Sequence, residues 1–157
     1  MNSTCRNDTV QPARTRVLAI DYGRRRIGLA ISDEMLLTAR PLQTLTRTNR
    51  RNDLRRLREI VREHAVGLLI VGHPLNLDGS AGDMAGEAAR FAARLRKELS
   101  VPVELADERL SSWEAEQIAA AARPPRTRAQ ATDQVAAAVI LRDYLERVRS
   151  GGKDHHR

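Results

Sequence analysis

Acidic residues at the ends of apolar segments are the part of this 157-residue chain best suited to chemistry. Asp21 closes the first apolar run, and Asp107 and Glu108 follow a later one. Asp133 stands just before an Ala/Val/Ile run. Any one of these acids, taken alone, is more often a turn or cap residue. Their occurrence at three element ends favours a shared site, because open α/β sheets carry their sites at strand ends.

If Asp21, Glu108 and Asp133 converge, their carboxylates repel one another and raise one another's pKa. A hard divalent cation among them would keep them ionised. Ligands that are all oxygen favour Mg²⁺ or Mn²⁺ over zinc. Two such ions can hold the attacking water and the leaving oxygen of a phosphodiester. The three acids are therefore the predicted catalytic and metal-binding residues, with Asp107 as a candidate outer ligand.

Basic and glycine-containing segments near these acids are predicted to contact substrate. The arginine triplet 24–26 follows Asp21 closely, and the segment 123–128 precedes Asp133. The loop 71–80 contains two glycines that permit close backbone approach to a phosphate. An ordinary loop and solvated arginines are the alternative interpretation, and His73 in this loop is more often structural. The predicted substrate-binding residues are Arg24, Arg25, Arg26, Asn76, Arg109, Arg126 and Arg128.

Composition points to a polyanionic partner. Lys and Arg number 27 against 20 Asp and Glu, which gives a net charge of +7. Arginine forms bidentate bonds to phosphate better than lysine does, so nucleic acid is favoured. The aromatic fraction is only 3%, which argues against base-stacking platforms. The single cysteine, the absence of a long apolar run and the polar N-terminus predict a cytoplasmic protein without a membrane segment.

Strand-like and helical patterns alternate along the chain. Short apolar runs predict strands over 16–21, 26–32, 36–45, 66–71 and 101–106. Helical spacing predicts one helix capped by Asn52 or Asp53, a second capped by Ser80, a third over 111–122 and a last one over 129–149. Residues 1–15 and 150–157 are predicted to be disordered tails around one domain, 16–149.

This order predicts an α/β protein with a mixed five-stranded sheet and helices on both faces. It matches the ribonuclease H-like fold. In that fold the first strand is central and the final helix packs beside it, which is how the three acids would meet.

The motifs together closely resemble the YqgF/RuvX family over about residues 16–149. The matching blocks are Asp21-Tyr22-Gly23 with the turn after it, 71–79, 107–111, and Asp133 with the run 137–141. This family is related to the RuvC Holliday-junction resolvases and shares their ribonuclease H-like fold. The resemblance implies a nuclease that matures the 5′ end of pre-16S ribosomal RNA. It also implies that Asp21, Glu108 and Asp133 bind the metal, whereas His73 departs from the family's usual apolar residue.

The leading hypothesis is a metal-dependent nuclease that acts on structured RNA, or on branched or single-stranded DNA. A resolvase-like nuclease for Holliday junctions and a non-catalytic nucleic-acid-binding module are the alternatives. An ATPase of the actin-like type also has an Asp-x-Gly turn, but it duplicates the fold and needs more than twice this length. Oligomeric state does not follow from the sequence.

Overall fold

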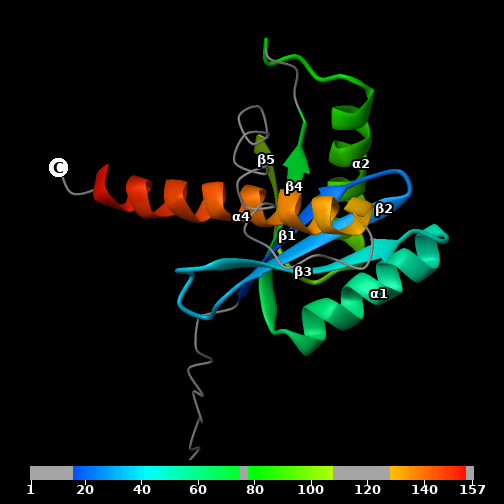
Figure 1. Cartoon of the computed structure of the whole chain (residues 1–157), viewed down its shortest axis with the longest axis horizontal. Helices are drawn as coiled ribbons and strands as arrows, with labels where there is room; N and C mark the ends of the chain where they lie inside the picture. Colours follow the sequence, from blue (N-terminus) through cyan, green and yellow to red (C-terminus); the bar gives the residue numbers. More distant parts are fainter. Residues whose placement is uncertain (1–15, 75–77, 108–127, 155–157) are drawn as a thin grey trace, which may run out of the picture.

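The computed structural model describes residues 16–74, 78–107 and 128–154, and it has the mixed α/β architecture that the sequence predicts (Figure 1). Five strands and three helices make up the described part. The elements in chain order are β1 (Arg16–Tyr22), β2 (Arg26–Ser32), β3 (Ala39–Thr46), α1 (Arg50–Glu63), β4 (Val66–His73), α2 (Asp83–Glu98), β5 (Val103–Asp107) and α4 (Arg128–Asp154). No helix among these residues is long and apolar enough to cross a membrane.

The five strands form one sheet in the order β3-β2-β1-β4-β5, so β1 is central. β1 pairs antiparallel with β2 and parallel with β4, and β4 pairs parallel with β5. β3 lies at the edge, where Pro41 is tolerated because its missing N–H interrupts only one ladder. The carboxyl ends of β1, β4 and β5 therefore meet at one end of the sheet.

Helices cover both faces of the sheet, as predicted. Helix α4 crosses one face, and α1 and α2 pack on the other (Figure 1). Leu18 and Ile20 of β1 belong to the core under α1 and α2, while Val17 and Ala19 belong to the core under α4. Since successive strand residues point to opposite faces, this alternation also decides where Asp21 and Tyr22 point.

Both predicted helix caps are wrong. The N-cap of α1 is Asn49, whose side chain accepts a hydrogen bond from the backbone N–H of Asn52. Asp53 lies one turn further on and accepts from the backbone N–H of Thr48 instead. The N-cap of α2 is Gly82, and Ser80 donates its hydroxyl to Asp78 within the preceding turn. Short polar side chains compete for several local backbone partners, so spacing alone does not choose among neighbours.

Helix α4 continues through Asp154, five residues beyond its predicted end. Gly151 and Gly152 suggested a stop, because glycine costs about 1 kcal/mol in a helix relative to alanine. The backbone remains helical across both. The predicted helix over 111–122 and the N-terminal tail over 1–15 lie outside the described residues, so the proposed division into one domain and two tails stays a prediction.

Candidate active site

Asp21 lies at the carboxyl end of the central strand and points to the face that α4 covers. It follows Val17 and Ala19 in the strand's alternation, and both belong to the core under α4. The strand places a carboxylate there because the apolar run ends at this point and the chain turns at Gly23. Any Cβ on Gly23 would overlap the carbonyl of Arg26, so the turn requires glycine.

Gly28 allows helix α4 to reach Asp21. Gly28 is the cross-strand partner of Asp21 in the β1–β2 pair. A Cβ atom on Gly28 would overlap the backbone carbonyl group of Asp133, so the helix backbone occupies the space that a side chain would need. This close approach brings Asp133 beside Asp21, as the sequence predicted. Gly28 itself was not predicted to matter, although an isolated glycine inside a strand pattern indicates such an approach.

The Asp21 carboxyl is buried close to the charge of Asp133. Burial of Asp21 and, to a smaller extent, the charge of Asp133 raise the pKa of the Asp21 carboxyl to about 7. Both causes disfavour the charged form of Asp21. A carboxyl group with such a pKa at a strand end is typical of functional sites, where a cation or a proton offsets the cost of burying the charge.

Arg26 neutralises the second acid. Its Nε donates a hydrogen bond of 2.7 Å to Oδ2 of Asp133, and both side chains are partly buried. Arg26 shares the α4 face with Gly28 because the two are separated by one residue of β2. The guanidinium that was predicted to contact substrate is thus turned toward the acids, where it orients Asp133.

Most of the remaining predicted site residues lie outside the part of the chain that the structure describes. Glu108, Asn76, Arg109 and Arg126 lie outside the described residues, and only the backbone of Arg128 is described, in the first turn of α4. Asp107, at the end of β5, lies opposite His73 in the register of the parallel β4–β5 pair. The strand alternates between Val103 in the core under α2 and Ala106 in the core under α4, which puts Asp107 on the face opposite Asp21.

Within the part of the chain that the structure describes, no three His, Cys, Asp or Glu side chains are grouped to hold a metal ion. Asp21 and Asp133 are two of the three predicted ligands. The donor set still fits a hard cation, because both are carboxylates and one is buried beside the other's charge. The predicted third ligand, Glu108, directly follows Asp107 in the sequence.

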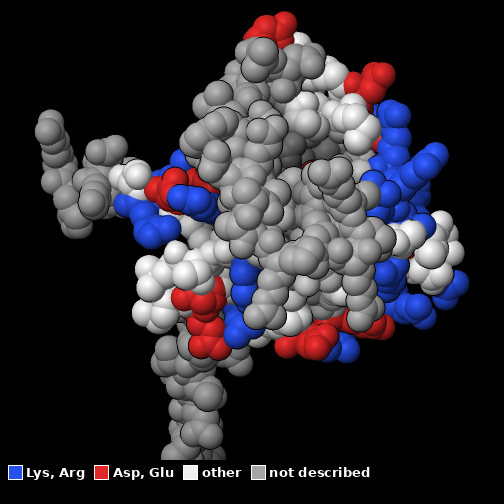
Figure 2. All heavy atoms as spheres, in the orientation of Figure 1, with Lys and Arg blue, Asp and Glu red and all other residues white. Residues whose placement is uncertain are grey.

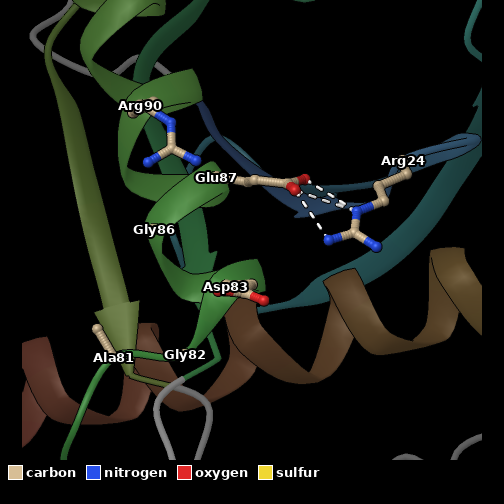
Figure 3. Close-up of a pocket in the computed structure, with 7 residues that line it drawn as sticks. All are labelled: Arg24, Ala81, Gly82, Asp83, Gly86, Glu87 and Arg90. Atoms are coloured by element: carbon tan, nitrogen blue, oxygen red, sulfur yellow. Dashed lines mark hydrogen bonds and ion pairs between the residues drawn. The ribbon is translucent and has the colours of Figure 1, made fainter.

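Arg24, at the β1–β2 turn, is held by helix α2. Its Nε and Nη2 bond to both carboxylate oxygens of Glu87, at 2.9 to 3.2 Å. This hydrogen bonding is the main cause that lowers the pKa of Glu87. Figure 3 shows Glu87 reaching from α2 toward Arg24, with Asp83 at the start of the helix. A cavity of about 340 Å³ lies between the turn and the helix.

Comparison with known proteins identifies the family. Residues 15–147 match the family model described as "RuvX: Holliday junction resolvase". The chain belongs to the RuvX family. A relative from Anaeromyxobacter sp. (strain K) is 47% identical over 84% of this chain and 97% of its own length, and one from Geobacillus kaustophilus is 46% identical over 83% and 97%. Both carry the name "Putative pre-16S rRNA nuclease".

Solved structures confirm the predicted fold of this RuvX chain. The Thermus thermophilus RuvC structure aligns with a TM-score of 0.56 at 16% identity, covering 85% of this chain and 96% of that one. RuvC from the same organism in complex with a Holliday junction substrate aligns with a TM-score of 0.52, also at 16% identity and with the same coverage. The fold is therefore ribonuclease H-like, as the element order predicted.

A second group of polar residues, on the α1/α2 face of this RuvX chain, was missed by sequence reasoning. Arg47, just after β3, donates to the hydroxyl of Tyr22, to the carbonyl of Gly23 and to Oδ2 of Asp53. Its guanidinium also lies 5.0 Å from the centroid of the Tyr22 ring. Two of these contacts reach 24 and 25 positions back along the sequence, to Gly23 and Tyr22, and the third reaches six positions forward to Asp53, so no single spacing pattern reveals the group.

Proposed function

We propose that this protein is a metal-dependent nuclease that processes the 5′ end of pre-16S ribosomal RNA in the cytoplasm. Membership of the RuvX family supports the nuclease class, and the names of the relatives support the substrate. The observation that carries the proposal is the approach of Asp133 to Asp21 across Gly28, at the carboxyl end of the central strand. A purely structural aspartate pair has no need of such burial, since burying like charges together destabilises the fold.

In this proposal, Asp21 and Asp133 hold Mg²⁺ or Mn²⁺ together with Glu108. A divalent cation there would supply the positive charge that stabilises a phosphodiester during hydrolysis. The protein's own part is to present ionised carboxylates in fixed positions. Arg26 holds the Asp133 carboxylate in place through Oδ2, and Oδ1 is the oxygen proposed to bind the cation.

The same proposal gives the basic residues a positioning role. Arg24 and Arg25 lie in the β1–β2 turn, directly after the strand that carries Asp21, and would contact backbone phosphates. The same role is proposed for Asn76 after β4, for Arg109 beside Glu108, and for Arg126 and Arg128, which precede Asp133. No side-chain nucleophile is needed, because water attacks phosphorus in such a reaction.

The test is cleavage of an end-labelled RNA containing the 5′ leader of 16S ribosomal RNA by the purified chain. Cleavage should require Mg²⁺ or Mn²⁺ and stop in EDTA, and Ca²⁺ should not support it because its looser coordination does not fix the in-line geometry. Asp133→Asn should lower the rate by at least about 10²-fold, the loss seen when groups that support a metal ligand are removed. Full activity in EDTA would contradict the proposal.

The matched control is Glu146→Gln, on the same helix as Asp133 but exposed and bonded to Arg142 on the helix surface. It should cleave as the unaltered protein does. Circular dichroism and RNA binding should be unchanged in both variants, since neither change removes an arginine. An Asp133→Asn variant that is unstable, but fully active per folded molecule, would show that Asp133 is structural.

A Holliday junction is the second candidate substrate, because the RuvX family model carries that description. The same assay with a four-way DNA junction in place of RNA decides between them. Faster cleavage of the junction than of the leader RNA would favour a resolvase. Binding of both without cleavage at any metal concentration would favour a non-catalytic nucleic-acid-binding module.

A further inference from the structure

A larger cavity lies on the face of the sheet opposite Asp21 and Asp133. Its volume is about 670 Å³, which is within the range of about 300 to 1,000 Å³ of known binding cavities. It is bounded by the β1–β2 turn, the segment between β3 and α1, and helix α2. The lining includes five arginines and one carboxylate, namely Arg24, Arg25, Arg47, Arg50, Arg94 and Asp53.

Arg47 is the fixed cation of this cavity. Three hydrogen bonds, to Tyr22, Gly23 and Asp53, hold its guanidinium, and its side chain is only 20% exposed. Burial alone would lower the pKa of Arg47, but the bonds to Tyr22 and Asp53 more than offset this effect and raise the pKa. Arg47 is therefore always charged. Because its guanidinium is already held in place, binding an anion costs little further side-chain entropy.

Three further arginines face the cavity with unused bonding capacity. Arg25 and Arg50 are exposed and Arg94 is half-buried. Among the described residues none of these three side chains forms an ion pair or a hydrogen bond. Asp53, the one carboxylate among the described residues of the lining, is already bonded to Arg47. Figure 2 shows Lys and Arg side chains gathered along this side of the molecule, beside the β1–β2 turn, α2 and the start of α1.

We propose that this arginine groove, formed by Arg25, Arg47, Arg50 and Arg94, binds the phosphodiester backbone of an RNA strand. Guanidinium groups match the geometry of phosphate oxygens and lose little hydration on pairing with them. The inference deepens the proposed function: it places part of the substrate on the α1/α2 face, while the acid pair lies on the α4 face.

The β1–β2 turn links the two places. Asp21 and Tyr22 are neighbours in β1, and their side chains point to opposite faces of the sheet. Strand β1 therefore presents the carboxylate of Asp21 to the α4 face. It presents Tyr22, which lines the arginine groove, to the α1/α2 face. An RNA strand that follows the turn, with Arg24 and Arg25 on it, would contact both faces. This arrangement favours a long polyanion over a small anion that fits within one cavity.

The experiment measures binding of a fluorescein-labelled 30-nucleotide single-stranded RNA of mixed sequence to the full chain in EDTA. The variant is Arg50→Gln with Arg94→Gln, which keeps most of each side chain's stem but removes both charges. We expect affinity at about 0.1 M salt to fall on the order of ten-fold, and the slope of log K against log salt to become shallower by about 1.4, or 0.7 per lost phosphate contact.

The matched control removes two charges from the same helices outside the groove: Arg55→Gln on α1 with Lys97→Gln on α2. Both residues are exposed and neither lines the cavity. The control should lose no more than about two-fold in affinity. Equal losses in the two double variants would mean that only net charge matters and would overturn the proposal, as would an unchanged affinity in the groove variant.

A charge-matched poly-glutamate peptide tests the other class of partner. If the peptide displaces the RNA at equal charge concentration, and its own binding needs Arg50 and Arg94, the groove recognises acidic protein and the proposal is wrong. Because all measurements are made in EDTA, they do not depend on cleavage. A failed nuclease assay would leave the groove result intact, and a failed groove result would leave the acid pair untouched.

Discussion

At the scale of single residues, the site depends on what surrounds two aspartates. Asp21 is buried beside a like charge, which raises its pKa to about 7, whereas Asp133 has Arg26 as a direct partner. The pair is therefore asymmetric: Asp133 is bonded to a guanidinium, whereas Asp21, with a pKa of about 7, is only partly ionised at neutral pH. A divalent cation beside Asp21 would favour the ionised form of its carboxyl group.

The Asp21→Asn variant tests whether burying this charge lowers the thermal stability of the metal-free protein. The folded-state pKa of Asp21 is raised above its unfolded value of 3.8, so the native state binds the extra proton between about pH 4 and pH 7. Stability of the metal-free protein is then lost as pH rises through this window, by a few kcal/mol at most. The variant should melt at a higher temperature than the unaltered protein at pH 8, and at a similar temperature near pH 4.

Asp33→Asn is the opposite control for the pH measurement. Hydrogen bonds from the backbone, that of Thr38 first, lower the pKa of Asp33. An acid with a lowered pKa stabilises the fold above its unfolded pKa and loses that contribution as pH falls. The Asn variant should therefore be the less stable protein at pH 8. If Asp21→Asn also destabilises at pH 8, Asp21 is a turn residue rather than a buried functional acid.

Arg26→Gln examines the partner of Asp133. Without the guanidinium, Asp133 stands beside Asp21 without its Arg26 partner, and a partly buried charge-assisted hydrogen bond is lost. We expect a loss of about 1 kcal/mol in the free energy of unfolding at pH 8. Arg25→Gln, one residue earlier and exposed, should leave chemical denaturation unchanged and weaken RNA binding instead. Equal denaturation midpoints for the two variants would contradict an orienting role for Arg26.

At the scale of secondary-structure elements, the site depends on how close α4 comes to β2. Gly28→Ala places a methyl group on the backbone of Asp133, so the helix must move away from the sheet. Overpacking of this kind costs about 1 to 3 kcal/mol, and more where backbone is displaced. We expect a lower melting temperature together with loss of cleavage, because the distance between the two acids changes.

The matched control for Gly28→Ala is Gly86→Ala in helix α2. A Cβ there would meet only the guanidinium end of Arg90, at 3.4 Å. Since alanine is the better helix former, this variant should gain roughly 0.5 to 1 kcal/mol. Thermal melts of both variants, with cleavage rates alongside, separate the two glycines. Similar melting temperatures for the two would show that α4 does not depend on Gly28.

The sequence predicted the elements better than the contacts between them. The five strands were predicted within about three residues at each end because short apolar runs bounded by Gly, Asp and Pro are strong local patterns. The proximity of Asp21 and Asp133 followed from their places near element ends, while their roles in catalysis and metal binding stay predictions. The Arg47 contacts with Tyr22 and Asp53 did not follow, because they depend on how β3 and α1 sit against β1. Such tertiary contacts have no periodicity along the chain.

At the scale of the whole molecule, the acid pair and the arginine groove lie on opposite faces of the sheet. Asp21 and Asp133 lie between the sheet and α4, and the arginine groove lies beside α1 and α2. This separation keeps Arg25, Arg50 and Arg94 of the groove away from Asp21 and Asp133, so that a substrate can meet each group at a different place. A net charge of +7 on 157 residues then attracts a polyanion to the whole surface, while the local geometry decides where it is held.

The affinity of the full chain for RNA should accordingly depend strongly on salt. Each phosphate that an arginine neutralises releases a condensed counterion, so log K falls linearly with log salt. With 27 basic residues and few aromatics, this release is expected to dominate binding, and stacking contributes little. Raising salt from about 50 to 200 mM should weaken binding by roughly 10-fold or more, even if only a few phosphates are contacted. Fluorescence anisotropy in EDTA measures this directly, and Asp21→Asn, which removes no arginine, should give the same slope. A dissociation constant that hardly changes over this range would mean that hydrogen bonds to bases or apolar contacts carry the affinity, and that the positive charge serves another purpose.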